Sequence, residues 1–210
     1  MRPFSEKLLS LSSKELSSSG CAMNCEKLFN SSLSAELDML LTEKNGFYSF
    51  ESALHVFPYD TTENEIGLVD WNNTKLWISS YGDMAIDALY FAEDIFGGQF
   101  CLKRDGVYYF DPETAKFDIV APDINNWCKL LLSDYEVMTG YPIAHEWQIS
   151  YGVIPRGARL VPKIPFVAGG AYELDNLYVC SSWESLKARA YIAEQIRTVP
   201  DGSKIKIITK

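Results

Sequence analysis

The two histidines are the first candidates for catalysis in this chain, because a histidine exchanges a proton near neutral pH. His145 is followed directly by Glu146, and a small hydrolase could use such a pair as base and acid. His55 is far from both in the sequence. No second histidine follows His145 at metalloprotease spacing, and no Gly-x-Ser-x-Gly turn is present to hold a serine nucleophile. A catalytic triad through either histidine therefore lacks a nucleophile motif.

Metal and phosphate chemistry have little support in the spacing of the residues. Cys21 and Cys25 could share one helical face, but a zinc site needs two more ligands and both histidines are isolated. Gly97-Gly98 and Gly169-Gly170 precede extended sequence, whereas a phosphate loop leads into a helix N-terminus. We expect no cofactor and no metal. We also expect reduced thiols at all five cysteines, Cys21, Cys25, Cys101, Cys128 and Cys180.

Charge is distributed very unevenly along the sequence. The chain has 19 Lys and Arg against 28 Asp and Glu, a net charge of −9. Residues 51–94 contain nine acidic residues and a single basic one, Lys75, so this segment carries −8. Residues 156–210 carry +4. A negative field opposes contact with nucleic acid and accelerates encounter with a basic protein. Nucleic acid is therefore not an expected partner.

Two interpretations of the acidic segment remain open. It could be a face that keeps the protein in solution, or a docking surface for a basic partner. Neighbouring carboxylates such as Glu93 and Asp94 would serve catalysis only if a dry cleft raised the pKa of one of them. We take six acidic residues as candidates for partner binding: Asp60, Glu63, Glu65, Asp70, Asp83 and Asp87.

The elements that must position these residues change in type along the chain. Leucines at helical spacing predict a helix from Ser32 to a stop at Asn45-Gly46. Arg104-Asp105-Gly106 is typical of a hairpin, and the segment 111–114 of a turn with proline at its second position. Aromatic and β-branched runs predict a sheet in the middle third, with extended segments at 54–57, 66–71, 76–80, 89–92, 99–103, 107–110 and 116–121.

The last third of the sequence returns to helices. Asp123 is predicted to cap one helix, Tyr141-Pro142 to begin a second, and Ser181 with Glu184 to form a capping box for a third over 182–197. Residues 154–165 are expected to be irregular because of their prolines. Further strands are predicted at 166–168, 177–180 and 204–208. This order lacks regular βαβ alternation and predicts an α+β fold.

Length and composition favour a folded, cytoplasmic protein. With 210 residues and 47% apolar residues, the chain can bury a sizeable core. No apolar run reaches the roughly 18–20 residues of a membrane helix, so we expect no membrane partner. No apolar signal segment follows Met1. Residues 1–32 are rich in serine and are expected to be partly helical or flexible, ahead of a single domain over 33–210.

Several short motifs, taken in their order along the chain, resemble the SUKH superfamily. The resemblance rests on Asn45–Tyr48 after a helix, Phe91–Phe100, the Asp105-Gly106 hairpin and Asp111–Thr114. Four later segments are similar to a longer bacterial branch of that superfamily, at 165–170, 175–178, 193–196 and 200–202. The superfamily includes bacterial immunity proteins against polymorphic toxins and a fungal cell-wall regulator. The similarity covers residues 33–210.

The resemblance implies a mixed α+β domain with a bent, mostly antiparallel sheet and flanking helices, and a protein without catalytic residues. Such proteins bind a toxin and occlude its active site or a neighbouring surface, and no contact residue carries over between members. Many of the targets are nucleases, whose substrate grooves are basic, and an acidic protein fits such a groove. We therefore expect a cytoplasmic immunity protein against a cognate secreted toxin. The alternatives are a regulatory or scaffold protein of the same fold that binds host proteins, and the small hydrolase described above.

Overall fold

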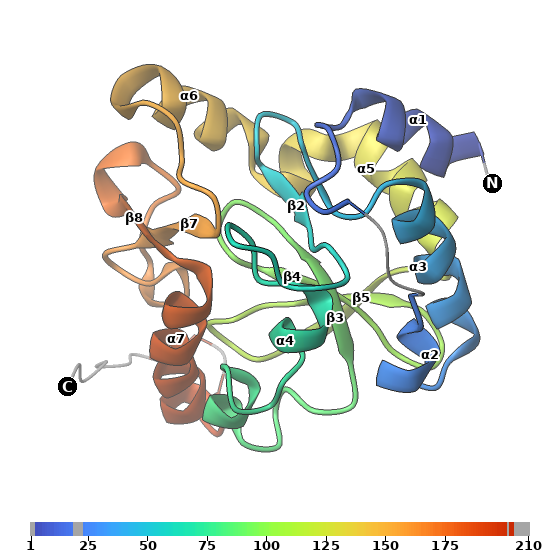
Figure 1. The fold of residues 1–210 in the computed structure, drawn as a ribbon. Helices are drawn as coiled ribbons and strands as arrows, with labels where there is room; N and C mark the ends of the chain where they lie inside the picture. The colour runs from blue at the N-terminus through green and yellow to red at the C-terminus, as the bar shows by residue number, and fades with distance from the viewer. Residues whose placement is uncertain (1–2, 19–22, 201, 204–210) are drawn as a thin grey trace.

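Six antiparallel strands form the main sheet, and each strand pairs with the next one in the sequence. The computed structural model describes residues 3–18, 23–200 and 202–203. These residues adopt an α+β fold, which confirms the predicted class (Figure 1). The turns predicted at 104–106 and 111–114 connect neighbouring strands of this sheet. Its strands are β1 (Phe47–Ser49), β2 (Leu54–Val56), β3 (Leu89–Glu93), β4 (Gln99–Leu102), β5 (Val107–Phe110) and β6 (Phe117–Ala121).

A separate two-stranded ribbon follows the sheet. It pairs β7 (Ala158–Pro162) with β8 (Leu177–Ser181) in antiparallel register. Residues 154–165 were expected to be irregular, and this prediction is wrong for β7. Pro162 is the last residue of the strand and lies opposite Leu177. A proline is tolerated there because the end of a two-stranded ribbon does not require its missing N–H.

Helices cover the sheet in two groups (Figure 1). On the right of the figure, α1 (Pro3–Leu11) packs on α5 (Ile124–Thr139), beside α2 (Cys25–Leu28) and α3 (Ser32–Glu43). On the left, α7 (Ser182–Ile196) packs on the 3-10 helix η1 (Ile78–Tyr81). The remaining helices are α4 (Leu68–Trp71), α6 (Tyr141–Tyr151), η2 (Phe166–Ala168) and η3 (Leu174–Asn176). In the described part of the chain, no helix has the length and apolar character needed to cross a membrane.

Buried aromatic rings join the sheet to the helices. Every residue of β3 and β4 is buried, because helices lie against the sheet from both sides. The Trp77 ring makes an edge contact with Tyr90 at 4.7 Å between centroids, and the Phe91 ring makes one with Trp127 at 4.9 Å. Edge contacts of this kind contribute about 0.5–1.5 kcal/mol each beyond the area they bury. The core therefore fixes η1 and α5 against the same strand.

The N-terminal residues belong to this packing. Leu8 and Leu9 of α1 are buried in the main core. The backbone N–H of Phe4 donates to Asn125 Oδ1 at 3.2 Å, and Lys44 Nζ donates to the carbonyl of Leu9 at 2.7 Å. Residues 3–18 are thus tied to α5 and to the end of α3.

Three predicted strands are short helices instead. Residues 68–71 form α4, 78–81 form η1 and 166–168 form η2. Tertiary packing decides the first two, because Trp71 enters the core from α4 and Trp77 from the turn before η1, and the indole N–H of Trp77 donates to the Trp71 carbonyl at 3.0 Å. Aromatic composition is the same for a strand and for such a turn, so the sequence pattern could not separate them.

Helix ends agree with the predictions in all but one case. The helix predicted from Ser32 is α3, Asp123 accepts the Asn126 N–H at the start of α5, and Tyr141 begins α6. The capping box of α7 is wrong, because the Ser181 side chain makes no cap hydrogen bond. The next residue, Ser182, donates its hydroxyl to buried Glu93 instead. The strand predicted at 204–208 lies outside the described residues.

Candidate functional site: a buried charge network and two surface pockets

The fold divides the acidic segment of residues 51–94 into a buried and an exposed set. Glu65, Glu93 and Asp94 are buried. Of the six candidate binding residues, Glu65 therefore does not contribute its side chain to the surface. Asp60 is half-buried, and four are exposed: Glu63, Asp70, Asp83 and Asp87.

Glu93, at the end of β3, is the centre of a buried charge network. Its Oε1 lies 2.9 Å from Nη2 of Arg159 and 3.1 Å from Nδ1 of His55. Its Oε2 accepts hydrogen bonds from Gln99 Nε2, at 3.2 Å, and from the Ser182 hydroxyl. Burial alone would raise the pKa of Glu93, but the Arg159 guanidinium and His55 hold that pKa at about 2. Glu93 is therefore an ionised carboxylate with its counter-charge in place.

His55 lies between two carboxylates and is neutral. Its ring stacks on Tyr48 at 4.3 Å, and its Nε2 lies 3.6 Å from Glu65 Oε2. The Tyr48 hydroxyl donates to the same Glu65 oxygen at 3.2 Å. Burial lowers the pKa of His55 to about 4, and burial raises the pKa of Glu65. A pocket of about 280 Å³ lies outside this network, and Tyr48, Arg156 and Arg159 line part of its wall.

His145, the residue of the hydrolase alternative, is on the surface of α6. Its side chain is 47% exposed, and its Nδ1 lies 2.7 Å from Glu51 Oε2 rather than against Glu146. It is not among the residues that line the pockets of about 570, 340, 280 and 210 Å³. The histidine that could be a base is therefore separate from these four pockets.

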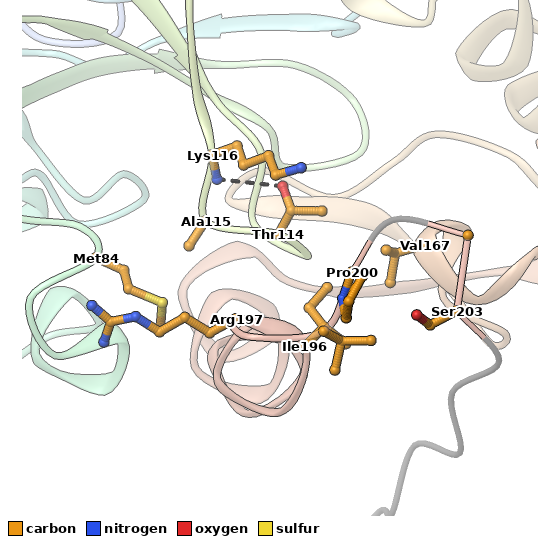
Figure 2. Close-up of a pocket in the computed structure, with 11 residues that line it drawn as sticks. Met84, Thr114, Ala115, Lys116, Val167, Ile196, Arg197, Pro200 and Ser203 are labelled. Atoms are coloured by element: carbon orange, nitrogen blue, oxygen red, sulfur yellow. Dashed lines mark hydrogen bonds between the residues drawn. The ribbon is translucent and has the colours of Figure 1, made fainter.

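Two adjoining pockets lie where the β5–β6 turn meets η2 and the end of α7. The larger, of about 570 Å³, is drawn in Figure 2 and is mostly apolar, with Met84 on one side and Ile196 and Pro200 on another. Arg197 lies along its edge and forms two contacts of 2.7 Å with the Asp83 carboxylate. The exposed Asp83 carboxylate is therefore already paired with a guanidinium.

The smaller pocket, of about 340 Å³, shares Thr114 and Val167 with the larger one. Aromatic rings and carboxylates line it together, with one guanidinium. Its lining residues that carry chemistry are Phe96, Tyr109, Asp111, Glu113, Phe166, Tyr172 and Arg189. Here a buried carboxylate, that of Glu113, lines an open cavity.

Four of the candidate acids form two groups. Asp60 and Asp70 lie close together, because Thr61, the residue after Asp60, donates its hydroxyl to Asp70 Oδ2. Gly67 also lies against the Asp60 backbone, so that a side chain at Gly67 would collide with it. Asp83 and Asp87 follow η1. The Trp71–Trp77 contact joins α4 to η1, so both groups are held by the same core.

Cysteines and metal ligands add no site. Cys25, Cys101 and Cys128 are buried, and burial raises the pKa of each thiol. Cys180 is half-buried, and all four of these cysteines are free thiols. Cys21 lies outside the described residues. Within the ranges that the structure describes, no three His, Cys, Asp or Glu side chains are grouped so that they could hold a metal ion.

The sequence analysis considered His55, Glu65 and Glu93 separately, but it missed Arg159 and selected no residue of the smaller pocket as a site residue. Arg159 had a signal, since it is a lone charge within an apolar run that forms β7. Glu93 also had one, because it ends the apolar run of β3. Glu113 and Tyr172 had none, because both stand in polar turn sequence and only the fold brings them to one cavity.

Comparisons with known proteins bear on the fold. No family profile matches the chain, and no curated protein matches it. Among solved structures, the chain is similar to the crystal structure of Atu4351 from Agrobacterium tumefaciens, with a TM-score of 0.56 and 7% sequence identity. The match covers 88% of this chain and 87% of that chain. At this identity the similarity shows a shared fold and nothing about activity.

Proposed function

We propose that this chain is a non-enzymatic immunity protein that binds a cognate secreted bacterial toxin in the cytoplasm and occludes the functional surface of that toxin. The observation that carries the proposal is the contrast between its buried and exposed acids. Buried Glu93 is neutralised internally by Arg159. Glu63, Asp70 and Asp87 are exposed and form no ion pair with any residue that the structure describes. An unpaired negative surface is available to a basic partner.

The ordered SUKH-like motifs also support this proposal. The segment Phe91–Phe100 forms the end of β3, the following turn and the start of β4, in the middle of the sheet. Gly98 is needed in that turn, because a side chain there would collide with the Tyr109 hydroxyl. The motif residues therefore serve the fold, as expected for a family whose members share architecture and differ in their targets.

The exposed acids are expected to act on the rate of encounter more than on the lifetime of the complex. Unpaired surface charges create a long-range field that steers a basic partner, whereas a few desolvated contacts supply most of the affinity. Salt screens the field over roughly 8–10 Å at physiological ionic strength, so the association rate should fall as salt increases.

The test of function is co-expression with the toxin encoded beside this chain. Cells that carry both genes should survive, and cells that carry the toxin alone should not. If no toxin gene is adjacent, or if survival is the same with and without this chain, the immunity proposal is rejected. A stable complex with a host protein in the absence of any toxin would instead favour the regulatory or scaffold alternative.

The electrostatic part of the proposal has its own test with the purified toxin. Glu63→Lys combined with Asp70→Lys should slow association about threefold or more and change dissociation less. The matched control is Glu146→Lys, which reverses an exposed acid on α6, away from α4 and η1. An association rate that is unchanged by the double reversal and insensitive to salt would contradict the role of the acidic surface.

A further inference from the structure

The smaller pocket has a corner of three aromatic rings that come from different segments. The rings of Phe166 and Tyr172 are nearly parallel, with centroids 3.8 Å apart. Phe96 stands across both, at 5.5 Å from Phe166 and 5.3 Å from Tyr172. Tyr172 is 58% exposed, so its ring is at the mouth of the pocket rather than in a core. Aromatic faces arranged around an open cavity attract cations through their negative quadrupoles.

Glu113 is a carboxylate in this pocket that lacks a full set of partners. Its Oε2 accepts the Val167 N–H at 2.8 Å, which holds η2 in place. Its Oε1 is buried and has no hydrogen-bond partner among the residues that the structure describes. The residue is only 3% exposed, and its burial raises the pKa of the carboxyl group. A buried carboxylate oxygen without a donor is costly, and the negative charge of Glu113 lies in the wall of the pocket.

Two further carboxylates add to the negative potential of the pocket. Asp111 lines it and accepts hydrogen bonds from the Glu113 N–H and the Thr114 hydroxyl, both at 2.8 Å. Asp94 lies behind Tyr109, whose hydroxyl donates to Asp94 Oδ2 at 2.8 Å. Burial raises the pKa of Asp94 to about 6. At neutral pH Asp94 is therefore an anion close to the cavity, and Asp111 is a second carboxyl group in the wall itself.

Arg189 also lines the pocket, and its charge lowers the pKa of Glu113 and of Asp94 without a direct ion pair to either. Its Nη1 donates to the Phe96 carbonyl at 2.7 Å, and its Nη2 donates to the Ser185 hydroxyl at 2.8 Å. It forms no ion pair with a carboxylate in the described ranges of the chain. Two carboxylates thus line the pocket and a third, Asp94, lies behind Tyr109, against one guanidinium whose N–H groups donate to other acceptors.

We propose that this pocket binds the cationic end of a lysine or arginine side chain that a partner protein inserts between Tyr172 and Glu113. The inference rests on the proposed function, because it names the chemistry by which a basic toxin would be anchored. A volume of about 340 Å³ is at the lower end of the range for small-molecule sites, about 300–1,000 Å³, and suits one long side chain. A desolvated cation held by aromatic rings and a carboxylate is the type of contact that dominates interface affinity.

The probe for this pocket is N-acetyl-arginine amide, with its neutral isostere N-acetyl-citrulline amide as the matched ligand control. Titration of the full chain, followed by NMR of the aromatic side chains, should give saturable shifts at Phe166 and Tyr172 with the arginine probe. The citrulline probe should bind at least tenfold more weakly. Equal binding of the two probes, or no saturable shift with the arginine probe, would overturn the proposal.

Three variants locate the binding. Tyr172→Ala removes a ring that is largely exposed, and it should weaken binding of the arginine probe at least fivefold. Tyr172→Phe keeps the ring and should leave binding unchanged. Glu113→Gln keeps an acceptor for the Val167 N–H but removes the charge, and it should also weaken binding at least fivefold. The proposal fails if Tyr172→Ala and Glu113→Gln, shown by their NMR spectra to be folded, bind the probe as the unaltered chain does.

The same variants separate this inference from the proposed function. If Tyr172→Ala and Glu113→Gln neutralise the toxin as well as the unaltered chain, the pocket is not an anchor and the inference is overturned, while the immunity function stands. If the arginine probe binds but the chain protects against no toxin, the pocket's cation preference is supported and the proposed function is overturned.

Discussion

Two buried carboxylates in this molecule have opposite surroundings. Glu93 lies 2.9 Å from Arg159, which holds the pKa of Glu93 at about 2. Glu113 lies in a pocket lined by Arg189, but that arginine donates to other acceptors, and burial raises the pKa of Glu113. The first carboxylate is completed by the fold itself. The second is left with an unsatisfied oxygen beside an open cavity.

This difference separates a structural charge from a binding charge. A buried ion pair that is broken by removing one partner leaves an uncompensated charge, so both partners become necessary for stability. A buried carboxylate without a cationic partner destabilises the free protein and favours any ligand that supplies the missing cation. Burial by itself therefore does not identify a functional carboxylate, and the proposed role of Glu113 rests on its place in the wall of the pocket.

The largest expected effect on stability comes from breaking the buried Glu93–Arg159 ion pair. Arg159→Met should lower the free energy of unfolding by about 3–5 kcal/mol, because Glu93 would stay buried and ionised without its counter-charge. The measurement is denaturant unfolding at pH 7. Arg156→Met is the matched control, because the Arg156 side chain is 60% exposed and its Nε lies as far as 3.8 Å from Glu65 Oε1. This substitution should lower the free energy of unfolding by less than about 1 kcal/mol. Equal costs for the two variants would break the comparison.

The second effect is a loss of stability in mild acid. The folded pKa of His55, about 4, is below its usual value of 6.5, so folding favours neutral His55. The contribution is complete above pH 6.5 and is lost as the pH falls toward 4, and it amounts to about 3 kcal/mol. Glu93, with a folded pKa of about 2, adds a similar loss below pH 4.5.

The measurement is the free energy of unfolding between pH 7.5 and 4.5, compared with that of His55→Gln. Asp94 acts in the opposite direction, because its raised pKa of about 6 gives stability as it becomes protonated. Subtracting the curve of His55→Gln from that of the unaltered chain removes this contribution. His145→Gln, at an exposed histidine, should keep the original slope. If His55→Gln keeps it too, His55 is not the neutral buried group described above.

The smallest effect on stability is expected at Glu113, the buried carboxylate with an unsatisfied oxygen. Glu113→Gln should change the free energy of unfolding by no more than about 0.5 kcal/mol or raise it, because it removes a buried charge and keeps an acceptor for the Val167 N–H. The same substitution at Glu93 should cost about 3–5 kcal/mol, since it leaves Arg159 unpaired. A loss at Glu113 as large as the loss at Glu93 would show that Glu113 is also structural.

Local features of the fold could be predicted from the sequence because they depend on neighbouring residues. The hairpin at 104–106 joins β4 to β5, and Asp123 caps α5, as expected from turn and capping chemistry alone. The strand β1 was not predicted, because its three residues directly follow the predicted helix stop at Asn45-Gly46. The helices α4 and η1 were mistaken for strands, because Trp71 and Trp77 owe their burial to distant strands rather than to their neighbours.

The candidate site shows the same limit. Six acids were selected from one charged segment, and the sequence pattern did not distinguish Glu63 from Glu65. The structure exposes Glu63 and buries Glu65 against Tyr48 and His55. The two residues are only two positions apart, and no local rule separates them, because the burial of Glu65 depends on strands β1 and β2.

The sequence by itself determined the α+β class, the turns that join β4 to β5 and β5 to β6, and the negative charge, because short-range turn chemistry, periodicity and composition carry that information. Only the tertiary structure decided which carboxylates are neutralised. Arg159 of β7 meets Glu93 of β3, while Arg189 of α7 passes Glu113 and bonds the Phe96 carbonyl. Such pairings join residues far apart in the chain, and they exist only after packing has closed the long loops between them.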